Sequence, residues 1–440
     1  MRTALSASRT NRRKRQPLAA ERPDREQLRD SASAIEHQVL RHLDSYLLQL
    51  ESMVRAAGGV VHRASDAAAA NRIVLELVQG TGESEIIRAD SALTTEIGLG
   101  DALAAAGITT CGNDLAAAEG TDPVLRERLL RAKVAVTGAN FVVSESGTVM
   151  LVESGGTGRM CLTLPRTLIS VAGIDRIVPT WRDLEVVLEL LAGGGERMPR
   201  CISTWTGVID GDGPREFHLV LVDNVRTRAL AEELVRAALL TDRHATAVPR
   251  EYLRHAPGIE PHDRTAVLSL FVERSKHHGA EIHRVTADEL PATVTGALTR
   301  HGAHSVVAPD GVPASWLAEW SAAPGNRVVA DEPELTPLEL DRIDAVVTSC
   351  AAAVADSATV VLDGGSGQGR RAPTLLPDCH ICVVRAEQVA SAIPEVIAVL
   401  DPDRPLTWFS GPPTTAGGKG IRVPSGPGPR RLVLILVEPE

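Results

Sequence analysis

The chain repeats itself, and this repeat limits the folds that it can adopt. The segment Val136–Arg159 aligns without gaps with Val347–Arg370, at an offset of 211 residues. Both segments begin with Val-Thr, pass through an acidic residue followed by Ser-x-Thr-Val, and end in a glycine-rich loop closed by arginine. Both then continue through Thr-Leu and proline into an apolar strand and a helix. A length of 440 residues allows two or three domains of about 150 residues, and the repeat reduces this to two tandem copies of one domain.

The repeat divides the chain into four parts. We expect residues 1–30 to form a disordered basic tail, because arginines and a lysine are followed by the polar stretch Gln16–Arg29 and not by the apolar core of a signal peptide. The first copy is expected at 31–240. The polar segment 241–264, which contains three prolines and several histidines, is the expected linker. The second copy then occupies 265–440.

In both copies, strand-like segments alternate with helices of ten or more residues. This alternation is typical of βαβ units and predicts an α/β fold with parallel sheets. Four Phe, five Trp and two Tyr leave Ala, Val, Leu and Ile to build the core, which suits buried parallel strands. In the first copy we expect helices at Ser31–Ala57, Ala67–Gln79, Ser91–Ala106 and Trp181–Leu191, and strands at Gly59–His62, Glu85–Arg88, Ile108–Thr110, Lys133–Val136, Phe141–Val143, Thr148–Val152 and Thr167–Ala172. In the second copy we expect helices at Val267–Gly279 and Pro291–Arg300, and strands at Glu281–Val285, Ser305–Ala308 and Ile381–Val384.

Composition argues against two classes of partner. The net charge of −10 repels a phosphate backbone and the few aromatic rings leave little for stacking on bases, so nucleic acid is not an expected partner. The longest apolar runs, such as Leu432–Val437, are far shorter than the roughly 18 residues of a membrane span. Six cysteines are too few for a disulfide framework, so a reducing cytoplasm is the expected location.

The loop Asp363–Gly369 (D-G-G-S-G-Q-G) is a candidate anion site. It does not fit a dinucleotide fingerprint, because a second apolar strand follows it where that fingerprint requires a helix, so a hairpin-like connection is expected. Its amides and the following arginine pair could bind a carboxylate or a phosphate, and a purely structural turn is the alternative. With the equivalent loop of the first copy, the candidate ligand-binding residues are Gly155, Gly158, Arg159, Gly367, Gln368, Gly369, Arg370 and Arg371.

Two further residues have side chains suited to catalysis. Glu145 lies at a turn between two apolar strands, where it could act as a base or nucleophile or simply cap the turn. His380 alternates with Cys379 on an expected strand and could face the glycine-rich loop. Cys379 and Cys382 point to opposite faces of that strand and are expected to be buried small hydrophobes.

No metal or other cofactor is expected. The remaining histidines lie near helix ends and turns without carboxylates at ligand spacing, so we expect them to be solvated. They include His277, His278, His283, His301 and His304.

Longer strings resemble a known family. T-G-A-N-F-V-V-S-E-S-G-T-V-M-L and G-I-D-R-I-V-P-T-W-R-D-L resemble lactate utilisation protein B, whereas D-G-G-S-G-Q-G-R-R-A-P-T-L-L-P-D-C-H-I-C-V-V-R and R-P-L-T-W-F-S-G-P resemble lactate utilisation protein C. Together the resemblances cover most of residues 30–440. Both families carry the LUD domain, so the resemblance implies two tandem LUD domains of the sugar-isomerase and CoA-transferase-like (NagB/RpiA) class. It also implies a role in the oxidation of L-lactate to pyruvate in the cytoplasm.

Departures from the family pattern refine this implication. Protein B carries cysteine clusters for iron–sulfur centres after its LUD domain, but Val225–His255 contains no cysteine. The first copy keeps Glu145 and has Leu168 where the family has histidine, whereas the second keeps His380 and has the shorter acid Asp356. The candidate catalytic residues are therefore Glu145, His380 and Asp356. The first copy lacks the histidine of the family pattern, and the second lacks its longer acidic side chain.

These observations predict a non-redox subunit or assembly factor of lactate oxidation. Its expected partners are the subunits that carry the iron–sulfur clusters, and its expected ligand is a small carboxylate or phosphate. One alternative is a degenerate binding module that senses a small anionic metabolite such as a carboxylate, a phosphate or CoA. Another is an enzyme that transfers acyl or CoA groups through Glu145, so the sequence leaves open whether the chain is an enzyme.

Overall fold

The computed structural model describes residues 23–112, 123–153, 156–192, 201–226, 248–260, 262–412, 414–416, 422–424 and 428–439. Of the expected basic tail, residues 1–22 lie outside this part of the chain. The remainder of the expected tail is ordered, since helix α2 (Arg25–Arg41) already begins there and Leu28 is buried. Among the described residues, no helix combines the length and apolar character needed to cross a bilayer.

Each copy of the repeat contains a parallel six-stranded sheet. The strand order is β1-β10-β7-β4-β2-β3 in the first copy and β11-β22-β17-β14-β12-β13 in the second. The sheet of the first copy consists of β1 (Val60–Ala64), β2 (Glu85–Ala89), β3 (Thr109–Cys111), β4 (Val134–Gly138), β7 (Thr167–Gly173) and β10 (Glu216–Val222). That of the second consists of β11 (Glu281–Val285), β12 (Ser305–Val307), β13 (Arg327–Val329), β14 (Ala345–Thr348), β17 (Cys379–Arg385) and β22 (Arg431–Val437). The two orders correspond strand by strand, which confirms the α/β fold and the two copies.

Helices of both copies pack against the sheets. In the first copy they are α2, α3 (Leu43–Ala56), α4 (Ala67–Gly80), α5 (Ala92–Glu96), α6 (Leu99–Ala105), α7 (Pro123–Arg131), α8 (Thr157–Thr163) and α9 (Trp181–Ala192). In the second they are α11 (Arg264–His277), α12 (Leu290–Arg300), α13 (Ala318–Ser321), α14 (Pro337–Leu340) and α15 (Ile393–Ile397). The expected helix Ser31–Ala57 is two helices that meet at His42, and Ser91–Ala106 is divided at Gly98, whose φ of +64° is a left-handed conformation that glycine adopts at little cost.

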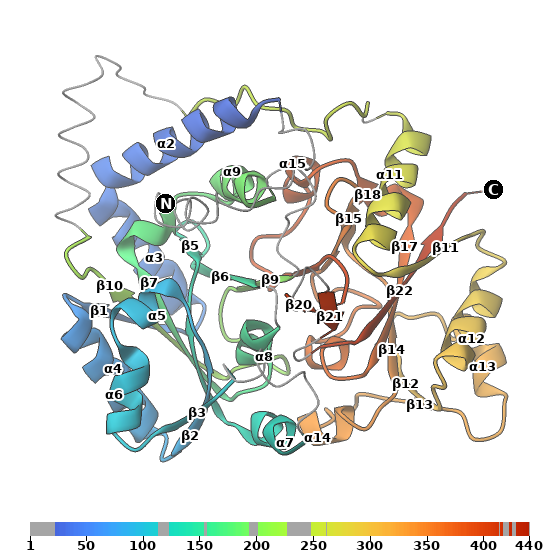
Figure 1. Ribbon diagram of the computed structural model, residues 1–440, viewed down its shortest axis with the longest axis horizontal. Helices are drawn as coiled ribbons and strands as arrows, with labels where there is room; N and C mark the ends of the chain where they lie inside the picture. The colour runs from blue at the N-terminus through green and yellow to red at the C-terminus, as the bar shows by residue number, and fades with distance from the viewer. Residues whose placement is uncertain are drawn as a thin grey trace.

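A third sheet joins the two copies. In the described part of the chain it has eight strands in the order β18-β15-β16-β19-β9-β6-β5-β8, four from each copy. They are β5 (Phe141–Val143), β6 (Thr148–Glu153), β8 (Ile177–Val178), β9 (Cys201–Trp205), β15 (Ala352–Val354), β16 (Thr359–Leu362), β18 (Val389–Ala390) and β19 (Thr407–Phe409). A small separate ladder pairs β20 (Thr414–Ala416) with β21 (Arg422–Pro424). In Figure 1 the first copy is blue to green, the second is yellow to red, and β9 lies between them.

The two halves of the eight-stranded sheet are joined by the antiparallel pairing of β9 with β19, which we call the seam. Ser203 of β9 pairs with Thr407 of β19, and Cys201 pairs with Phe409. Both strands carry Thr-Trp, as Thr204-Trp205 and Thr407-Trp408, so the seam relates the copies by an approximate two-fold axis. The Thr204 N–H donates to the Leu406 carbonyl at 2.8 Å, and the Leu406 N–H donates to Thr204 Oγ1 at 2.7 Å.

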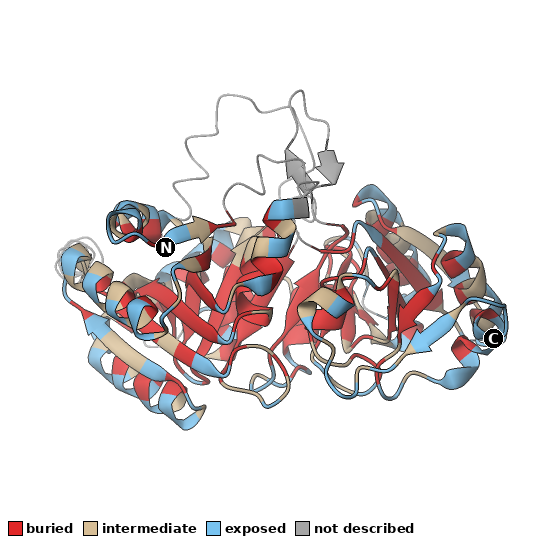
Figure 2. Cartoon of the chain, turned by 90° about the horizontal axis from the view of Figure 1, so that it is seen from below, coloured by how far each residue is buried: buried red, intermediate tan, exposed pale blue. Residues whose placement is uncertain are grey.

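The layers follow from these sheets. Helices α4, α5 and α6 pack on the outer face of the first parallel sheet, and α12 and α13 on that of the second. The inner faces of both parallel sheets pack toward one face of the eight-stranded sheet, whose other face is covered by α9 and α15. Figure 2 shows that the buried residues are concentrated along these sheets. One core extends from Leu168 in the first copy to Val346 in the second, so the two copies share a single interior.

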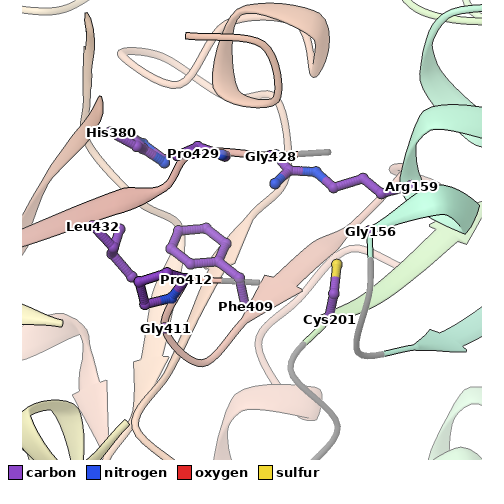
Figure 3. A pocket seen from close by; sticks show the side chains of 10 residues that line it. All are labelled: Gly156, Arg159, Cys201, His380, Phe409, Gly411, Pro412, Gly428, Pro429 and Leu432. Carbon is purple, nitrogen blue, oxygen red and sulfur yellow. The ribbon is translucent and has the colours of Figure 1, made fainter. Parts of the chain in front are cut away.

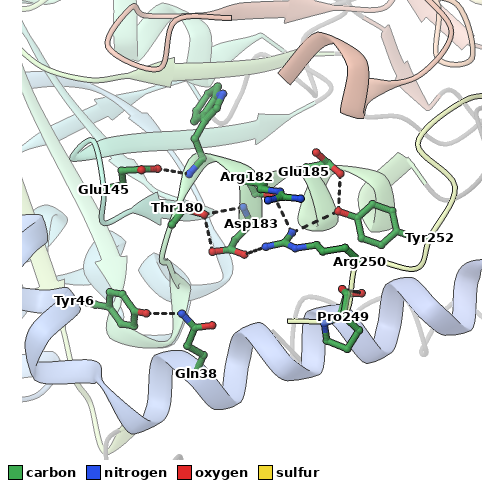
Figure 4. Close-up of polar contacts among 12 residues, drawn as sticks. Gln38, Tyr46, Glu145, Thr180, Arg182, Asp183, Glu185, Pro249, Arg250 and Tyr252 are labelled. Carbon is green, nitrogen blue, oxygen red and sulfur yellow. Dashed lines mark hydrogen bonds and ion pairs between the residues drawn. The ribbon is translucent and has the colours of Figure 1, made fainter. Parts of the chain in front are cut away.

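The described part of the expected linker packs as a strap across the first copy. Arg250 contacts Asp183 of α9, and the hydroxyl of Tyr252 donates to Glu185 at 2.5 Å (Figure 4). Arg254 also pairs with Glu185 at 3.0 Å. Glu185 is only 1% exposed, so this charge is balanced where water does not reach it. The connection between copies is therefore anchored to α9 by buried polar contacts.

The two tyrosines of the chain allow a matched test of this strap. Tyr252→Phe removes a buried hydrogen bond to a carboxylate and is expected to lower the free energy of unfolding by about 1–2 kcal/mol. Tyr46→Phe removes a half-buried hydrogen bond from Gln38 and is expected to cost less than about 1 kcal/mol. Chemical denaturation of both variants measures the difference, and equal effects would show that the strap contributes little to stability.

Candidate functional site

A small cavity lies at the seam, and both copies line it. Its volume is about 30 Å³, space for roughly two water molecules, because one water needs about 10–15 Å³ of such volume. The first copy contributes Arg159 and Cys201, and the second contributes His380, Phe409 and Leu432 (Figure 3). A cavity of this size accommodates a small acid group rather than a whole nucleotide or CoA.

Helix α8 carries Arg159 to the cavity. Gly158 leaves room for this, since a Cβ atom there would lie 2.8 Å from Leu151 Cδ2 and 3.1 Å from Glu153 Oε2. The Glu153 carboxylate accepts the N–H groups of Gly158 at 2.6 Å and Arg159 at 2.7 Å, so it caps the start of the helix. Burial raises the pKa of Glu153, although these amides favour its charged form.

The Arg159 side chain crosses the seam. Its Nη2 atom donates to the carbonyl of Thr374 at 3.2 Å and to Thr374 Oγ1 at 2.7 Å. Its Nε atom is buried and has no hydrogen-bond partner among the described residues. Burial lowers the pKa of the guanidinium, which nevertheless remains charged at neutral pH because free arginine titrates above about 12. A buried cation with an unused donor at a cavity is suited to bind an anion.

His380 faces the same cavity from strand β17. The Thr348 hydroxyl lies 2.8 Å from His380 Nε2, and the Phe409 ring packs 5.4 Å from the imidazole, centroid to centroid. Burial, and secondarily the nearby charge of Arg159, lowers the pKa of His380 to about 3. The imidazole is therefore neutral at physiological pH, and it can offer a ligand a single polar contact without competing for the arginine.

Within the described part of the chain, no strong nucleophile adjoins these groups. Burial raises the pKa of the Cys201 thiol to about 11, so the thiol is protonated at neutral pH. The rest of the described lining is largely apolar and includes Phe409, Leu432 and Pro429 (Figure 3). A buried cation, a neutral imidazole and an apolar wall favour binding of a small carboxylate over covalent chemistry at this position.

The glycine-rich loop of the second copy uses its own polar groups internally. Gln368 accepts the Asp363 N–H at 2.8 Å and donates to the Asp363 carboxylate at 2.8 Å. The Gly367 N–H donates to the Asp310 carbonyl at 2.8 Å. A Cβ atom at Gly367 would lie 2.7 Å from Ser349 Oγ, and one at Gly369 would lie 2.7 Å from Pro309, so close packing accounts for both glycines. The loop connects β16 to β17 in a different sheet, so the expected hairpin-like connection is wrong.

The other candidate ligand-binding residues fall into three groups. Gly155 lies outside the described residues. Arg370 is held away from the cavity by both oxygens of Asp331, each at 2.6 Å, and by the Leu335 carbonyl at 2.7 Å. Arg371 is paired with Asp212 at 3.0 Å and stacks on Trp205, with 4.4 Å from its Cζ atom to the ring centroid. Of the predicted set, the structure brings Arg159 and His380 together at one cavity.

The two candidate carboxylates lie apart from His380. Glu145 is exposed at the β5–β6 turn, where its Oε2 atom accepts the Trp181 N–H at 2.8 Å and thus caps helix α9 (Figure 4). Asp356 lies at the equivalent turn of the second copy, where its N–H donates to the Ser391 carbonyl at 3.1 Å. Neither residue lines the seam cavity. The structure does not assemble the predicted acid and histidine into one site.

Sequence reasoning missed the residues that complete the cavity from the seam strands. Phe409 belongs to the second Thr-Trp strand, and Cys201 belongs to the first. Repetition of Thr-Trp in both copies was the available signal. Because pairing between the copies is a long-range contact, this signal alone did not show that the strands meet.

Two predictions about cysteine and histidine can be compared with the structure. Cys379 and Cys382 are buried in the cores on opposite faces of their sheet, as predicted. The prediction that the histidines are solvated is wrong for His278, which is 4% exposed and lies 3.0 Å from the Ser410 carbonyl. It also misses that His283 and His301 share Glu281, which Arg300 contacts as well. Among the described residues, no three His, Cys, Asp or Glu side chains are placed to hold a metal ion.

The neutral state of His380 predicts a dependence of stability on pH. The pKa of His380 is about 3 in the folded chain and about 6.5 when unfolded, so between these values the unfolded chain binds a proton that the folded chain does not. The free energy of unfolding should therefore fall with falling pH by about 1.4 kcal/mol per unit in this window, or about 2 kcal/mol between pH 7 and pH 5.

His380→Gln removes this contribution, and denaturation at pH 7 and pH 5 measures it. The same substitution at the exposed residue His304 is the control. If His380→Gln loses as much stability on acidification as the wild type and the His304 variant, His380 is not held in the neutral form.

Comparison with known proteins identifies the family. The LUD domain model matches residues 47–222 and 268–437. The chain is 35% identical over 282 residues to lactate utilization protein B of an Exiguobacterium species, covering 53% of this chain and 60% of that protein. It is 42% identical over 204 residues to lactate utilization protein C of Deinococcus radiodurans, covering 45% of this chain and 93% of that protein. The chain thus spans 60% of the length of the protein B relative.

A solved structure also matches. The crystal structure of a DUF162 family protein from Deinococcus radiodurans is 42% identical, with a TM-score of 0.34, and covers 40% of this chain and 99% of that one. The two family matches fall on the two parallel sheets and on the strands that meet at the seam. The resemblance derived from the sequence is confirmed: the chain belongs to the LUD domain family and carries two copies of the domain.

Proposed function

We propose that this chain is a non-redox component of cytoplasmic lactate utilisation that binds a small carboxylate at the seam cavity. Its relatives include proteins named lactate utilization protein B and lactate utilization protein C, which match this chain over 53% and 45% of its length. This chain, with two LUD domains, is therefore similar to both kinds of relative. This supports a role in the same process.

The observation that carries the proposal is the convergence of Arg159 and His380 on one cavity from different copies. A bound carboxylate would satisfy the buried Nε donor of Arg159, which costs free energy while it lacks a partner. L-Lactate and pyruvate also carry an oxygen on the carbon next to the carboxylate. That oxygen would contact the imidazole of His380, and the methyl group would contact the ring of Phe409.

The distribution of cysteines supports the non-redox part of the proposal. Oxidation of lactate to pyruvate removes two electrons, which must pass to a carrier. The six cysteines of this chain form no disulfide, are buried and are dispersed through the packed cores, and a four-iron cluster requires four thiolates at one place. We propose that partner subunits carry the clusters and that this chain binds the acid or helps to assemble those subunits.

We place the ligand at Arg159 rather than at the glycine-rich loop. Arg370 and Arg371 are each paired with an aspartate of the chain, so an anion there would have to displace an internal carboxylate. Glu145 is exposed and lies outside the cavity, which disfavours acyl or CoA transfer through that residue. A sensor of small carboxylates would bind its ligand in the same cavity. It would differ from a component of the oxidation pathway in its effect on growth on L-lactate.

Binding measurements can separate Arg159 from Arg370, its equivalent in the repeat. L-Lactate and pyruvate titrated into the purified chain should bind saturably, as followed by calorimetry or by ligand-observed NMR. Arg159→Met, which removes the charge and keeps the side-chain length, should weaken binding at least tenfold, because it removes a charge-assisted hydrogen bond of roughly 1.5–3 kcal/mol.

Arg370→Met is the matched control and should bind both acids as the wild type does. Loss of binding in the Arg370 variant but not in the Arg159 variant would place the ligand at the glycine-rich loop. Absence of binding of either acid to the wild type would remove the proposed site.

The cellular role is tested by growth on L-lactate. Deletion of the gene should impair growth on L-lactate but not on glucose, the wild-type gene should restore it, and the Arg159→Met gene should restore it only in part. Affinity purification from the source organism should recover cluster-bearing subunits. Normal growth of the deletion strain, with ligand binding intact in vitro, would indicate a sensor instead of a component of the oxidation pathway.

A further inference from the structure

The two copies cross the seam with arginines that point in opposite directions. Arg159 of the first copy reaches Thr374 of the second, and Arg371 of the second reaches Asp212 of the first. Aromatic rings of the seam strands lie on both sides. Arg159 lines the cavity with Phe409, and Arg371 stacks on Trp205. The repeat aligns Arg159 with Arg370 and not with Arg371, so the two-fold axis does not relate Arg159 to Arg371. Each copy nevertheless extends one buried arginine across the seam.

These two cations differ in what balances their charge. Arg371 is 5% exposed and is bound by Asp212 through its backbone N–H at 3.1 Å, its Nε at 3.0 Å and its Nη2, which donates to the Asp212 carbonyl at 3.4 Å. Arg159 has no ion pair with an acidic side chain in the described part of the chain, and its Nε donor is unused. One side of the seam is filled by a carboxylate of the protein, and the other side contains a cavity.

The loop that supplies Asp212 is shaped around Arg371. It connects β9 to β10 and turns at Gly211 and Gly213, whose φ angles are +79° and +80°. A Cβ atom at Gly213 would lie 2.5 Å from Arg371 Nη2 and 2.9 Å from the Trp205 ring, so only glycine allows this approach. The corresponding connection of the second copy, between β19 and β22, is about twice as long, so it is not built to the same design.

The sheet registers show a second asymmetry. His380 pairs with Val346 in the second parallel sheet, and Leu168 pairs with Ala135 at the equivalent place in the first. The imidazole that faces the open cavity thus has an apolar counterpart in the first copy. The filled side has a cation and a carboxylate but lacks the histidine.

We infer that Arg371 and Trp205 form a second carboxylate position across the seam, which the chain's own Asp212 occupies, so that one chain binds one carboxylate ligand. The limit of one ligand rests on the proposed binding at Arg159, whereas the occupied position does not. Asp212 thereby acts as a built-in ligand that closes one of two carboxylate positions at the seam. Removal of its carboxylate would open a cryptic site for a free small carboxylate such as formate.

Chemical rescue tests this inference directly. Asp212→Ala leaves a buried cation unpaired, so it should unfold at a lower temperature than the wild type. Formate should then raise the melting temperature of Asp212→Ala saturably and by more than it raises that of the wild type, with sodium chloride at equal ionic strength as the reference. The difference between the two chains isolates the Arg371 position from any formate bound at Arg159. If the variant does not fold alone, refolding in formate and in chloride provides the same comparison.

Two variants control for indirect effects. Asp212→Asn retains the volume of the side chain and should gain no formate response beyond the wild type. The double variant Asp212→Ala, Arg371→Met lacks the cation and should also lose the additional response. An additional response that persists without Arg371, or equal responses of Asp212→Ala and the wild type, would overturn the inference.

Stoichiometry separates this inference from the proposed function. One lactate or pyruvate per wild-type chain agrees with both, and two per chain would overturn the inference while keeping the binding function. If the wild type binds neither acid but formate rescues Asp212→Ala through Arg371, the proposed function fails and the occupied carboxylate position is retained.

Discussion

The antiparallel pairing of β9 with β19 is the contact on which the rest of the structure depends. Without it, each copy would end its mixed half-sheet at an edge strand with unpaired N–H and C=O groups, which are a template for aggregation. Pairing Thr407 with Ser203 removes both edges at once and completes an eight-stranded sheet. Because the parallel sheets pack toward the same face of this sheet, the seam also fixes how the two copies lie relative to each other. The cavity exists only where they meet.

Several charged side chains are buried near the seam. Among the described residues, some of them are paired with an opposite charge and others are not. Arg159, Arg371, Asp212 and Glu153 lie close enough that their charges influence one another, as the causes of the lowered pKa of Arg159 show. Burial of one ion typically costs several kcal/mol unless it is paired. Asp212 offsets this cost for Arg371, and Glu153 is held by the amides of helix α8. Both arginines keep one buried donor without a hydrogen-bond partner, Arg159 Nε and Arg371 Nη1, but among the described residues only Arg371 is paired with a carboxylate. A ligand carboxylate at Arg159 would therefore stabilise the folded chain as well as be bound by it.

Much of this fold could be predicted from local patterns. Apolar alternation locates strands such as Glu281–Val285, and the repeat fixes the number of domains, because both depend on residues close in sequence or on self-comparison. The seam could not be found in that way. Nothing within Thr407–Phe409 specifies that its partner is Ser203, some two hundred residues away, since backbone pairing is not encoded in side-chain type. The expected tail was too long for a related reason: burial of Leu28 depends on packing that the local sequence does not show.

The same difference between local patterns and long-range contacts explains which parts of the candidate site could be predicted. Sequence comparison identified Arg159 and His380 separately, as a loop arginine and a strand histidine, but not that they share a cavity. It weighted Arg370 and Arg371 equally with Arg159, because an arginine after a glycine-rich loop has the same local signature in both copies. The difference lies in their partners, Asp331 and Asp212, which come from distant segments.

Fusion of the copies makes such asymmetry possible. In a symmetric dimer of identical chains, any substitution appears on both sides of the two-fold axis. An Asp212 that closed one site would then close both, and a leucine in place of His380 would remove both imidazoles. In a single chain, the first copy has Leu168 and Asp212 while the second retains His380. The loss of a different element from each copy is therefore compatible with one intact composite site, in which the first copy contributes the cation and the second contributes the imidazole.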